Sequence, residues 1–454
     1  MFWFLKTGYL NGGKNMNTLE FDIKNKCGKI KVMHAVNNGP QKPGKTQTRG
    51  NFHYYSEAKI PYARMHDSAH WPAVGGHHLV DINGIFSDFS KDPYDAESYD
   101  FLLTDRYIEN TFNAGTEVFY RLGASIEHWE KKYNILPPED PKKWAVICEH
   151  IISHYTEGWA DGYNYKIEYW EIWNEPDCKD NSMWVGTKQQ FFDLYEISAT
   201  HLKNKFPHLK IGGPAISQSA FGDLEWAGEF IEYMGKRNVP LDFFSWHIYT
   251  GSTDETLRIG QDIRDMLDKN GYLKTESILN EWNYLRDWTD NFVYSIEQII
   301  GVKGAAFEAA MMCAAQNSSI DMLMYYDARP CAFNGLFDFY TARPLKGYYP
   351  IKMFSKLYEL GTQIECKNDM TDVYALGAVN DSKDAAFMIA RYEDNDEIIQ
   401  EKEITVSILE LRNKSLNCFW VDEDKNEAVE NVLIDENGIF KLSLKPNCCI
   451  LLSL

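Results

Sequence analysis

Short apolar runs rich in β-branched and aromatic residues alternate with longer segments of helical periodicity from about residue 29 to residue 360. This alternation is typical of βαβ units and therefore predicts a parallel sheet. Eight strands are predicted, at residues 29–34, 62–66, 116–121, 166–173, 209–213, 241–247, 277–281 and 321–325. Eight strands over this length fit a single closed (β/α)8 barrel, the TIM barrel, with some long loops.

Helical segments are predicted between these strands, for example at residues 140–157, 188–205 and 304–316. The first begins with Asp140 as N-cap and has Pro141 at its first position, where the missing N–H costs nothing. A doubly wound open sheet is the main alternative to the barrel. However, no G-x-G-x-x-G motif and no phosphate loop follows the first strand.

After Gly361 the pattern changes to short alternating strands separated by Asn, Asp, Lys and Gly. The predicted strands are residues 372–377, 385–392, 404–411, 439–444 and 449–454. They indicate a small antiparallel β-sandwich. We therefore expect three parts, namely an N-terminal extension (1–28), the barrel (29–360) and the β-sandwich domain (361–454).

The charge balance argues against two classes of partner. The formal net charge is −20, and no Lys/Arg-rich run occurs, so nucleic acid and membrane partners are not expected. Aromatic residues make up 14% of the chain, with 13 Trp and 27 Tyr. Such rings fill cores, and they also stack on the flat faces of sugars.

The cysteine pattern predicts neither a disulfide framework nor a zinc site, because the nine cysteines form no C-x-x-C pair. Residues 1–5 lack the features of a signal peptide, and no apolar run reaches membrane-spanning length. Met16 is an alternative start. These features predict reduced thiols and a cytoplasmic location, while a homo-oligomer is compatible with the sequence.

Two glutamates lie at the carboxyl ends of predicted barrel strands, where barrel enzymes build their active sites. The fourth strand ends in Trp-Asn-Glu-Pro, which contains Glu175, and the seventh ends in Asn-Glu-Trp, which contains Glu281. Cleavage of a glycosidic bond needs one carboxylic acid and a second carboxylate. For either glutamate alone a solvated strand-end or helix-cap residue is the favoured interpretation, but the two together favour a catalytic pair.

Residues 169–177 and 278–284 resemble the acid/base and nucleophile segments of the clan of retaining glycosidases on (β/α)8 barrels. Within that clan the chain most resembles glycoside hydrolase family 39, which includes β-xylosidases and α-L-iduronidases. Further matches are Arg64-Met65-His66, residues 242–249 and residues 334–337. The barrel followed by a β domain also fits, so the resemblance covers about residues 29–454.

This resemblance implies specific roles. Glu175 would be the general acid/base, Glu281 the nucleophile, and the anomeric configuration would be retained. The expected substrate-binding residues are Asn174 at the sugar 2-hydroxyl, Tyr249 holding the nucleophile, His247 and His66 lining the subsite, and Asp327 with Arg329 at sugar hydroxyls. Each has a structural alternative: a helix N-cap for Asn174, core packing for the histidines, and an ion pair for Asp327 and Arg329.

The second strand departs from the β-xylosidase pattern, because Met65 and Asp67 replace the Gly-flanked His of that family. The loop at residues 71–88 also looks specific to this lineage, which leaves the identity of the sugar open. His66 and His70 are four residues apart, but Pro72 breaks any helix and no carboxylate has a matching spacing. We therefore expect no metal and no cofactor.

The expected function is that of an exo-acting retaining glycosidase. It would remove a terminal, xyloside- or arabinoside-like sugar from an oligosaccharide or glycoside, with the exo mode following from the resemblance alone. The alternatives are an endo-acting enzyme of the same clan, an α-L-iduronidase-like activity, and a carbohydrate-binding barrel that has lost hydrolysis. An aldolase would need a lysine at a strand end, and no predicted strand ends in lysine.

Overall fold

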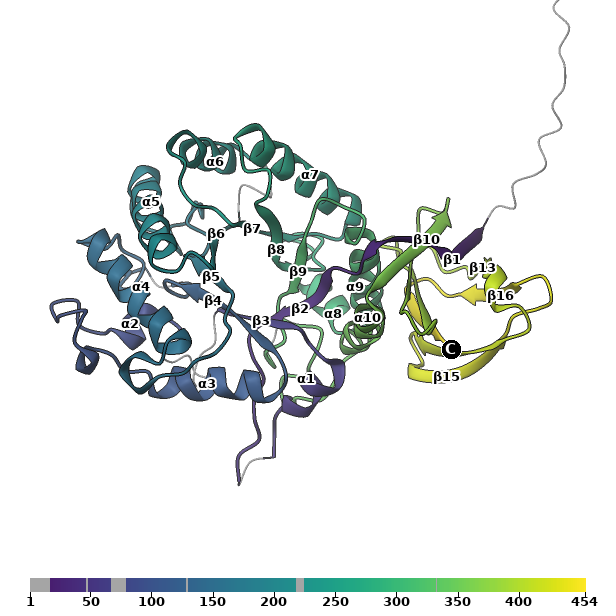
Figure 1. Ribbon diagram of the computed structural model, residues 1–454. Helices are drawn as coiled ribbons and strands as arrows, with labels where there is room; N and C mark the ends of the chain where they lie inside the picture. The colour runs from purple at the N-terminus through teal and green to yellow at the C-terminus, as the bar shows by residue number, and fades with distance from the viewer. Residues whose placement is uncertain (1–16, 46–47, 67–78, 128–129, 218–223, 332) are drawn as a thin grey trace, which may run out of the picture.

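In the computed structural model, which describes residues 17–45, 48–66, 79–127, 130–217, 224–331 and 333–454, eight parallel strands close into a barrel (Figure 1). The strands are β2 (Val32–Asn37), β3 (Tyr62–Met65), β4 (Glu117–Leu122), β5 (Tyr169–Ile172), β6 (Lys210–Ile216), β7 (Phe243–Tyr249), β8 (Glu276–Asn283) and β9 (Met322–Tyr325). They follow one another around the barrel in sequence order. The predicted (β/α)8 barrel is therefore confirmed, with the first strand beginning three residues later than expected.

Helices surround the barrel (Figure 1). They are α1 (Phe52–Ala58), α2 (Ile82–Ile85), α3 (Leu102–Asn113), α4 (Pro141–Thr156), α5 (Lys188–Lys205), α6 (Glu225–Arg237), α7 (Thr253–Lys269), α8 (Phe292–Ile299), α9 (Val302–Ala315) and α10 (Tyr348–Leu360). The side chain of Asp140 caps α4, as predicted, by accepting hydrogen bonds from the backbone N–H groups of Lys142 and Lys143. Helix α5 has the bounds expected from its periodicity.

A second sheet follows the barrel. Its strands are β10 (Thr362–Asn368), β11 (Val373–Val379), β12 (Ala385–Arg391), β13 (Lys402–Ser407), β14 (Ser415–Val421), β15 (Asn426–Leu433), β16 (Ile439–Leu444), β17 (Cys448–Ser453) and β1 (Thr18–Lys29). They pair in the order β15-β14-β17-β12-β11-β10-β1-β13-β16. All pairs are antiparallel except β1 with β13. Side chains from both ends of this sheet share one apolar core, which gives the expected sandwich-like arrangement.

Strand β1 departs from the expected division of the chain. It lies within residues 1–28, which we expected to form a separate extension, yet it pairs with β10 and β13 inside the second sheet. Leu19 and Phe21 are buried in the core of that sheet. The chain therefore begins its described part in the β domain and then enters the barrel. Residues 1–16, including the alternative start at Met16, lie outside the described part of the chain.

The two domains share a packed interface. Helices α9 and α10 lie between the barrel and the second sheet (Figure 1). In β17, Cys449 belongs to the core shared with the barrel, whereas Cys448 belongs to the core of the sheet. The adjacent cysteines therefore face opposite sides, as expected for a strand.

The interior of the barrel changes from apolar to polar along the strands. An apolar cluster that includes Phe119, Tyr169 and Phe243 lies within the barrel. Closer to the carboxyl ends of the strands, the buried residues include Arg64 and Glu171. Buried charges persist only where they are paired, so this polar layer marks the site.

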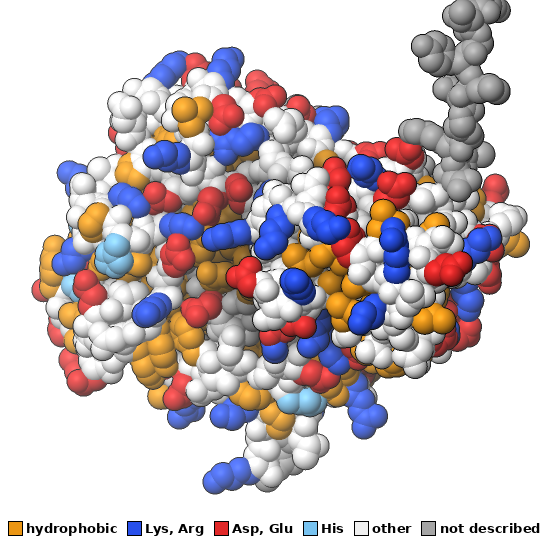
Figure 2. Space-filling model, turned by 45° about the vertical axis from the view of Figure 1, so that its right-hand side comes forward, with side chains coloured by type: hydrophobic (Ala, Val, Ile, Leu, Met, Phe, Trp, Pro, Cys, Tyr) orange, Lys and Arg blue, Asp and Glu red, His pale blue; other side chains and the backbone are white. Residues whose placement is uncertain are grey.

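The surface carries acidic and basic side chains side by side, with hydrophobic side chains exposed between them (Figure 2). Among the described residues, no helix is long and apolar enough to cross a membrane.

Candidate active site

The fold brings Glu175 and Glu281 together. Glu281 lies in β8, and Glu175 follows the end of β5 by three residues. One carboxylate oxygen of each glutamate, together with a ring nitrogen of His247, lies within 4.8 Å of the others. The side chains of Glu175 and Glu281 are 13% and 6% exposed, so both carboxyl groups are largely shielded from water yet reachable.

The backbone around Glu175 adopts an unusual conformation. Trp173 has a φ of 73° and Glu175 a φ of 46°, in the left-handed region that costs an L-residue roughly 1–2 kcal/mol. Two backbone hydrogen bonds hold it, from Trp173 N to the Leu122 carbonyl (2.7 Å) and from Glu175 N to the Ala215 carbonyl (2.9 Å). Neighbouring strands thus fix the direction of the Glu175 side chain.

Gly123, at the end of β4, lets this segment pack closely. Its φ is 141°, and a Cβ there would lie 3.2 Å from Trp173 Cα. A side chain at this position would therefore push the acid-bearing segment away from β4.

Arg64 connects the two catalytic segments. Its guanidinium donates to Glu281 Oε1 (2.8 Å), and also to Asn174 Oδ1 (2.5 Å). The side chain is fully buried. Arg64 therefore places a positive charge directly beside the Glu281 carboxylate and orients Asn174 at the same time.

Glu171 neutralises the remaining charge of Arg64. Its Oε2 accepts from Arg64 Nε at 2.7 Å, and its Oε1 accepts from Ser245 Oγ (2.7 Å) and Asn280 Nδ2 (2.5 Å). Each of these partners comes from a different barrel strand. The polar layer beneath the two glutamates is thus a connected hydrogen-bond network.

Tyr249 and His247 contact the catalytic pair from β7. The hydroxyl of Tyr249 donates to Glu281 Oε2 at 2.8 Å. His247 Nδ1 lies 2.8 Å from Glu175 Oε1 and 3.5 Å from Glu281 Oε2. Burial lowers the pKa of His247 to about 4, so the ring is neutral near pH 7.

His66 lies near the other carboxylate oxygen of Glu281. Its Nε2 is 3.7 Å from Glu281 Oε1, and its Nδ1 accepts a hydrogen bond from Arg121 Nε at 3.2 Å. Arg121 in turn pairs with Asp81 at 2.6 Å. The positions of His66 and His247 next to the glutamates distinguish them from histidines that only fill the core.

Burial raises the pKa of the carboxyl groups of Glu175 and Glu281. At Glu281 the neighbouring His247 and Arg64 and the hydrogen bond from Tyr249 act against this effect, whereas the charge of Glu175 adds to it. At Glu175 the hydrogen bonds from Ser217 and Cys178 do so, and Arg64 acts from farther away. Because Arg64 contacts Glu281 directly, its positive charge favours the carboxylate form of Glu281 more strongly than that of Glu175.

Asp327 lies just after β9 and is fully buried. Arg329 NH2 is 3.3 Å from Asp327 Oδ2, and Asn38 Nδ2 donates to the same oxygen at 3.2 Å. The peptide bond between Tyr326 and Asp327 is cis. The ion pair that we gave as the alternative to sugar binding is therefore formed.

An aromatic cluster borders the nucleophile. The rings of Trp288 and Phe333 lie 5.3 Å and 5.6 Å from that of Tyr249, between ring centroids. Trp288 is 50% exposed, whereas Tyr249 is buried. The half-exposed indole thus offers an apolar surface next to the residue that contacts Glu281.

Comparison with known proteins identifies the family. The model of the family described as glycosyl hydrolases family 39 matches residues 29–328. The chain belongs to this family. The resemblance inferred from the two glutamate segments and from the Arg64-Met65-His66 motif is therefore confirmed.

The family relatives match over part of their length. A β-xylosidase of Geobacillus stearothermophilus is 31% identical over 191 residues, which are 39% of this chain and 36% of that protein. The human α-L-iduronidase is 22% identical over 219 residues, or 44% of this chain and 32% of that protein. The matched segments thus span about a third of these relatives.

Two solved structures share the fold over nearly the whole chain. A glucosidase from Croceicoccus marinus has a TM-score of 0.79 at 19% identity, covering 96% of this chain and 98% of its own. A monomeric β-xylosidase from Caulobacter crescentus CB15 has a TM-score of 0.72 at 15% identity, covering 96% and 99%.

The family 39 site also contains residues to which our sequence analysis gave no role. Glu171 and Trp288 had none, and Arg64 was noted only as part of a motif. A signal for Glu171 was present, since it is a charged residue inside an otherwise apolar strand, Tyr-Trp-Glu-Ile. Trp288 lies in a loop, where the sequence pattern carries no comparable signal.

A cation could also meet the oxygens of Glu175 and Glu281 and a nitrogen of His247. Arg64 already supplies a positive charge 2.8 Å from Glu281, and a cation would compete with it there. The donor set therefore suits a proton-sharing carboxyl pair better than a metal. Of the spaced pair His66 and His70, the second lies outside the described residues, as do residues 71–78 of the loop expected to wall the pocket.

Proposed function

We propose that this family 39 protein is a retaining glycoside hydrolase in which Glu281 is the nucleophile and Glu175 the general acid/base. The observation that carries this proposal is the proximity of the pair, whose nearest oxygens lie within 4.8 Å. Retaining enzymes hold their two carboxyl groups about 5–5.5 Å apart, whereas inverting enzymes need about 6.5–9.5 Å to admit a water molecule. The spacing here supports the retaining arrangement.

The first half of the reaction follows from the contacts of each carboxyl group. The Glu281 carboxylate, oriented by Arg64 and Tyr249, attacks the anomeric carbon and forms a covalent ester. As the bond to the leaving oxygen breaks, Glu175 transfers its proton to that oxygen. Asn174, held by Arg64, forms a hydrogen bond with the sugar 2-hydroxyl. This hydrogen bond strengthens in the transition state.

The second half reverses these roles. Glu175, now a carboxylate, removes a proton from water, and the resulting hydroxide attacks the anomeric carbon. The ester bond breaks, and Glu281 leaves as a carboxylate beside Arg64. His247, neutral and 2.8 Å from Glu175 Oε1, lets the Glu175 carboxylate gain and lose its proton without an adjacent fixed charge.

We further propose a neutral terminal sugar of the xyloside or arabinoside type as the substrate. Two relatives at 31% identity, from Geobacillus stearothermophilus and Caldicellulosiruptor saccharolyticus, are described as β-xylosidases. A uronic acid, as in an α-L-iduronidase substrate, would need a cation for its carboxylate. The buried cations near the site are already paired, Arg64 with Glu171 and Glu281, and Arg121 with Asp81. The exo mode and the cytoplasmic location stay predictions of the sequence.

Proton NMR during the first minutes of hydrolysis tests the mechanism, before mutarotation mixes the anomers. We expect the first sugar released to have the configuration of the substrate. Release of the opposite anomer would overturn the double displacement and the role of Glu281. A panel of aryl xylosides, arabinosides, galactosides and uronides tests the sugar class, and fastest cleavage of the uronide would contradict the neutral-sugar proposal.

A further inference from the structure

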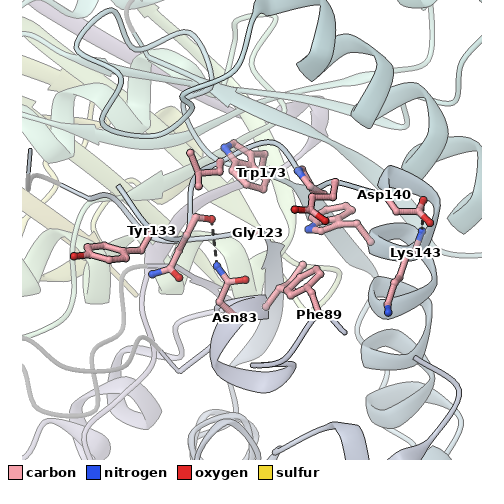
Figure 3. A pocket seen from close by; sticks show the side chains of 13 residues that line it. Asn83, Phe89, Gly123, Tyr133, Asp140, Lys143 and Trp173 are labelled. Carbon is pink, nitrogen blue, oxygen red and sulfur yellow. Dashed lines mark hydrogen bonds between the residues drawn. The ribbon is translucent and has the colours of Figure 1, made fainter. Parts of the chain in front are cut away.

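A cavity of about 420 Å³ lies at the carboxyl ends of β4 and β5, where Gly123 and Trp173 line it. Its walls come from the segments that follow β3, β4 and β5, and they include Asn83, Phe89, Tyr133, Glu139, Lys143 and Trp173. In Figure 3, Tyr133 and Lys143 lie on opposite sides, and Trp173 faces Asn83 and Phe89 across the cavity. Ligand pockets typically measure about 300–1,000 Å³, so this volume suits a small ligand.

Two aromatic rings remain open to solvent at this cavity. The side chain of Tyr133 is 63% exposed, and that of Phe89 is 37% exposed. An exposed flat ring can stack on a ligand, and it matches the apolar face of a pyranose. Lys131 Nζ lies 5.0 Å from the centroid of the Tyr133 ring, so a cation already supports this ring.

Polar groups that could meet hydroxyls stand around these rings. Asn83 Nδ2 donates to the Asn134 carbonyl at 3.2 Å, which fixes the side-chain amide and points its oxygen away from that carbonyl. Glu139 adds a carboxylate to the lining. Apolar rings combined with a few fixed amide and carboxylate groups are the lining that carbohydrates need.

The charge around the cavity selects against an anionic ligand. The lining contains the carboxylates of Glu139 and Asp140 and one ammonium group, that of Lys143. Lys143 Nζ already donates to the Lys91 carbonyl at 2.6 Å, and Asp140 caps α4. Lys131 beside Tyr133 adds a second ammonium group, so the local charge is close to neutral and offers no excess of positive charge for a uronate or a phosphate.

The cavity is connected to the catalytic site through the chain. Trp173 precedes Glu175 by two residues, and its ring lies 6.2 Å from that of Trp144, which also lines the cavity. Asn83 lies two residues after Asp81. Asp81 pairs with Arg121, which donates a hydrogen bond to His66. The cavity thus borders the catalytic machinery without containing either glutamate.

We propose that this cavity is a second saccharide-binding site, which holds a neutral sugar unit of an oligosaccharide outside the catalytic pair. The proposal rests on the proposed glycosidase function, because the neutral sugar assigned to this cavity is a unit of the oligosaccharide proposed as the substrate. It predicts that oligosaccharides bind at two places on the protein, one at Glu281 and one at Tyr133.

The test is calorimetric titration of the full chain carrying Glu281→Gln, which prevents turnover, with xylotetraose, cellotetraose and tetragalacturonic acid. We expect two binding events for a neutral tetrasaccharide. Tyr133→Ala should weaken one of them about tenfold or more, while Tyr133→Phe, which keeps the ring, should not. Tyr94→Ala is the matched control, because Tyr94 is 67% exposed on a neighbouring loop and does not line the cavity.

The outcomes separate this proposal from the proposed function. Titrations that superimpose for Tyr133→Ala and Tyr133→Phe overturn the second site, and tighter binding of tetragalacturonic acid overturns its neutral ligand class. Hydrolysis of aryl glycosides by the wild-type protein is measured alongside. Hydrolysis without a Tyr133-dependent event removes only the second site, whereas Tyr133-dependent binding without hydrolysis of any glycoside supports the site and removes the proposed function.

Discussion

The hydroxyl of Tyr284 lies 2.6 Å from Asp394 Oδ1, and this contact joins the segment after Glu281 to the β domain. Arg286 Nε donates to the same carboxylate at 3.1 Å. Tyr392, two residues before Asp394, donates a hydrogen bond to the carbonyl of Gly251 at 2.6 Å. Gly251 in turn follows Tyr249 by two residues. The β domain therefore holds both the strand end that carries Glu281 and the loop that follows its partner Tyr249.

The first prediction concerns this contact. Tyr284→Phe removes one charge-assisted hydrogen bond and should lower the free energy of unfolding by about 1.5–3 kcal/mol. Because the variant loosens the segment that carries Glu281, we expect a several-fold loss of kcat with little change in KM. Chemical denaturation and steady-state kinetics on an aryl xyloside measure the two effects.

Tyr272→Phe is the matched control for this variant. Tyr272 donates to the Val239 carbonyl at 2.8 Å, and both residues precede the amino ends of β7 and β8, at the opposite end of the strands from the two glutamates. Its loss should cost stability and leave kcat unchanged. If Tyr284→Phe likewise changes stability alone, the β domain only stabilises the fold and does not position Glu281.

The second prediction is that Glu281→Gln abolishes turnover of every substrate. The amide cannot form the glycosyl ester that the proposed double displacement requires. A mechanism-based 2-fluoro sugar should label Glu281 in the wild-type protein, as read by mass spectrometry of peptides. A label on another carboxylate would contradict the assignment.

The third prediction is that Glu175→Ala slows natural glycosides far more than activated aryl glycosides, by about 10²-fold or more, since a good leaving group needs little protonation. Azide should restore the rate as an external nucleophile and yield a glycosyl azide. Equal losses on both substrate types, with no effect of azide, would remove Glu175 as acid/base.

The pH profile gives an independent measurement of the same group. Burial raises the pKa of Glu175 above its ordinary value of 4.5. Because the general acid must carry its proton, the rate should fall as the pH rises through this raised pKa. The alkaline limb of kcat/KM should therefore lie above pH 4.5 and should disappear in Glu175→Ala. A limb that persists in this variant belongs to another group.

The barrel could be predicted from the sequence because its signal is local. Strands buried on both faces read as short apolar runs, such as 243–247, and each lies between helices of clear periodicity. The glutamates were found for the same reason, since Glu175 follows such a run by three residues and Glu281 lies close to the end of another.

Other elements were missed because their partners are distant in sequence or their patterns are weak. Strand β1 alternates only in its first half and then exposes a polar run, and its pairing with β10 joins segments more than 300 residues apart. Strand β15 is largely exposed at the sheet edge, so burial leaves no pattern in it. The role of Arg64 depends on Glu171 and Glu281, at separations of 107 and 217 residues.

The last prediction concerns His34, whose ring is fully buried in β2 next to Phe354 and Tyr358, with centroid distances of 5.3 Å and 5.1 Å. Burial lowers its pKa from 6.5 to about 3. Below pH 6.5 the unfolded chain therefore binds a proton at His34 that the folded protein does not. His34 thus lowers the free energy of unfolding as the pH falls from 6.5 toward 3. The loss amounts to about 1.4 kcal/mol per pH unit, or about 2 kcal/mol at pH 5.

His34→Phe should remove this part of the slope when unfolding free energies are compared at pH 7 and pH 5. His247 contributes in the same direction, so a residual slope is expected. His53→Phe, at an exposed position, is the control and should leave the slope unchanged. An unaltered slope in His34→Phe would show that the ring takes up its proton in the folded protein as readily as in the unfolded chain.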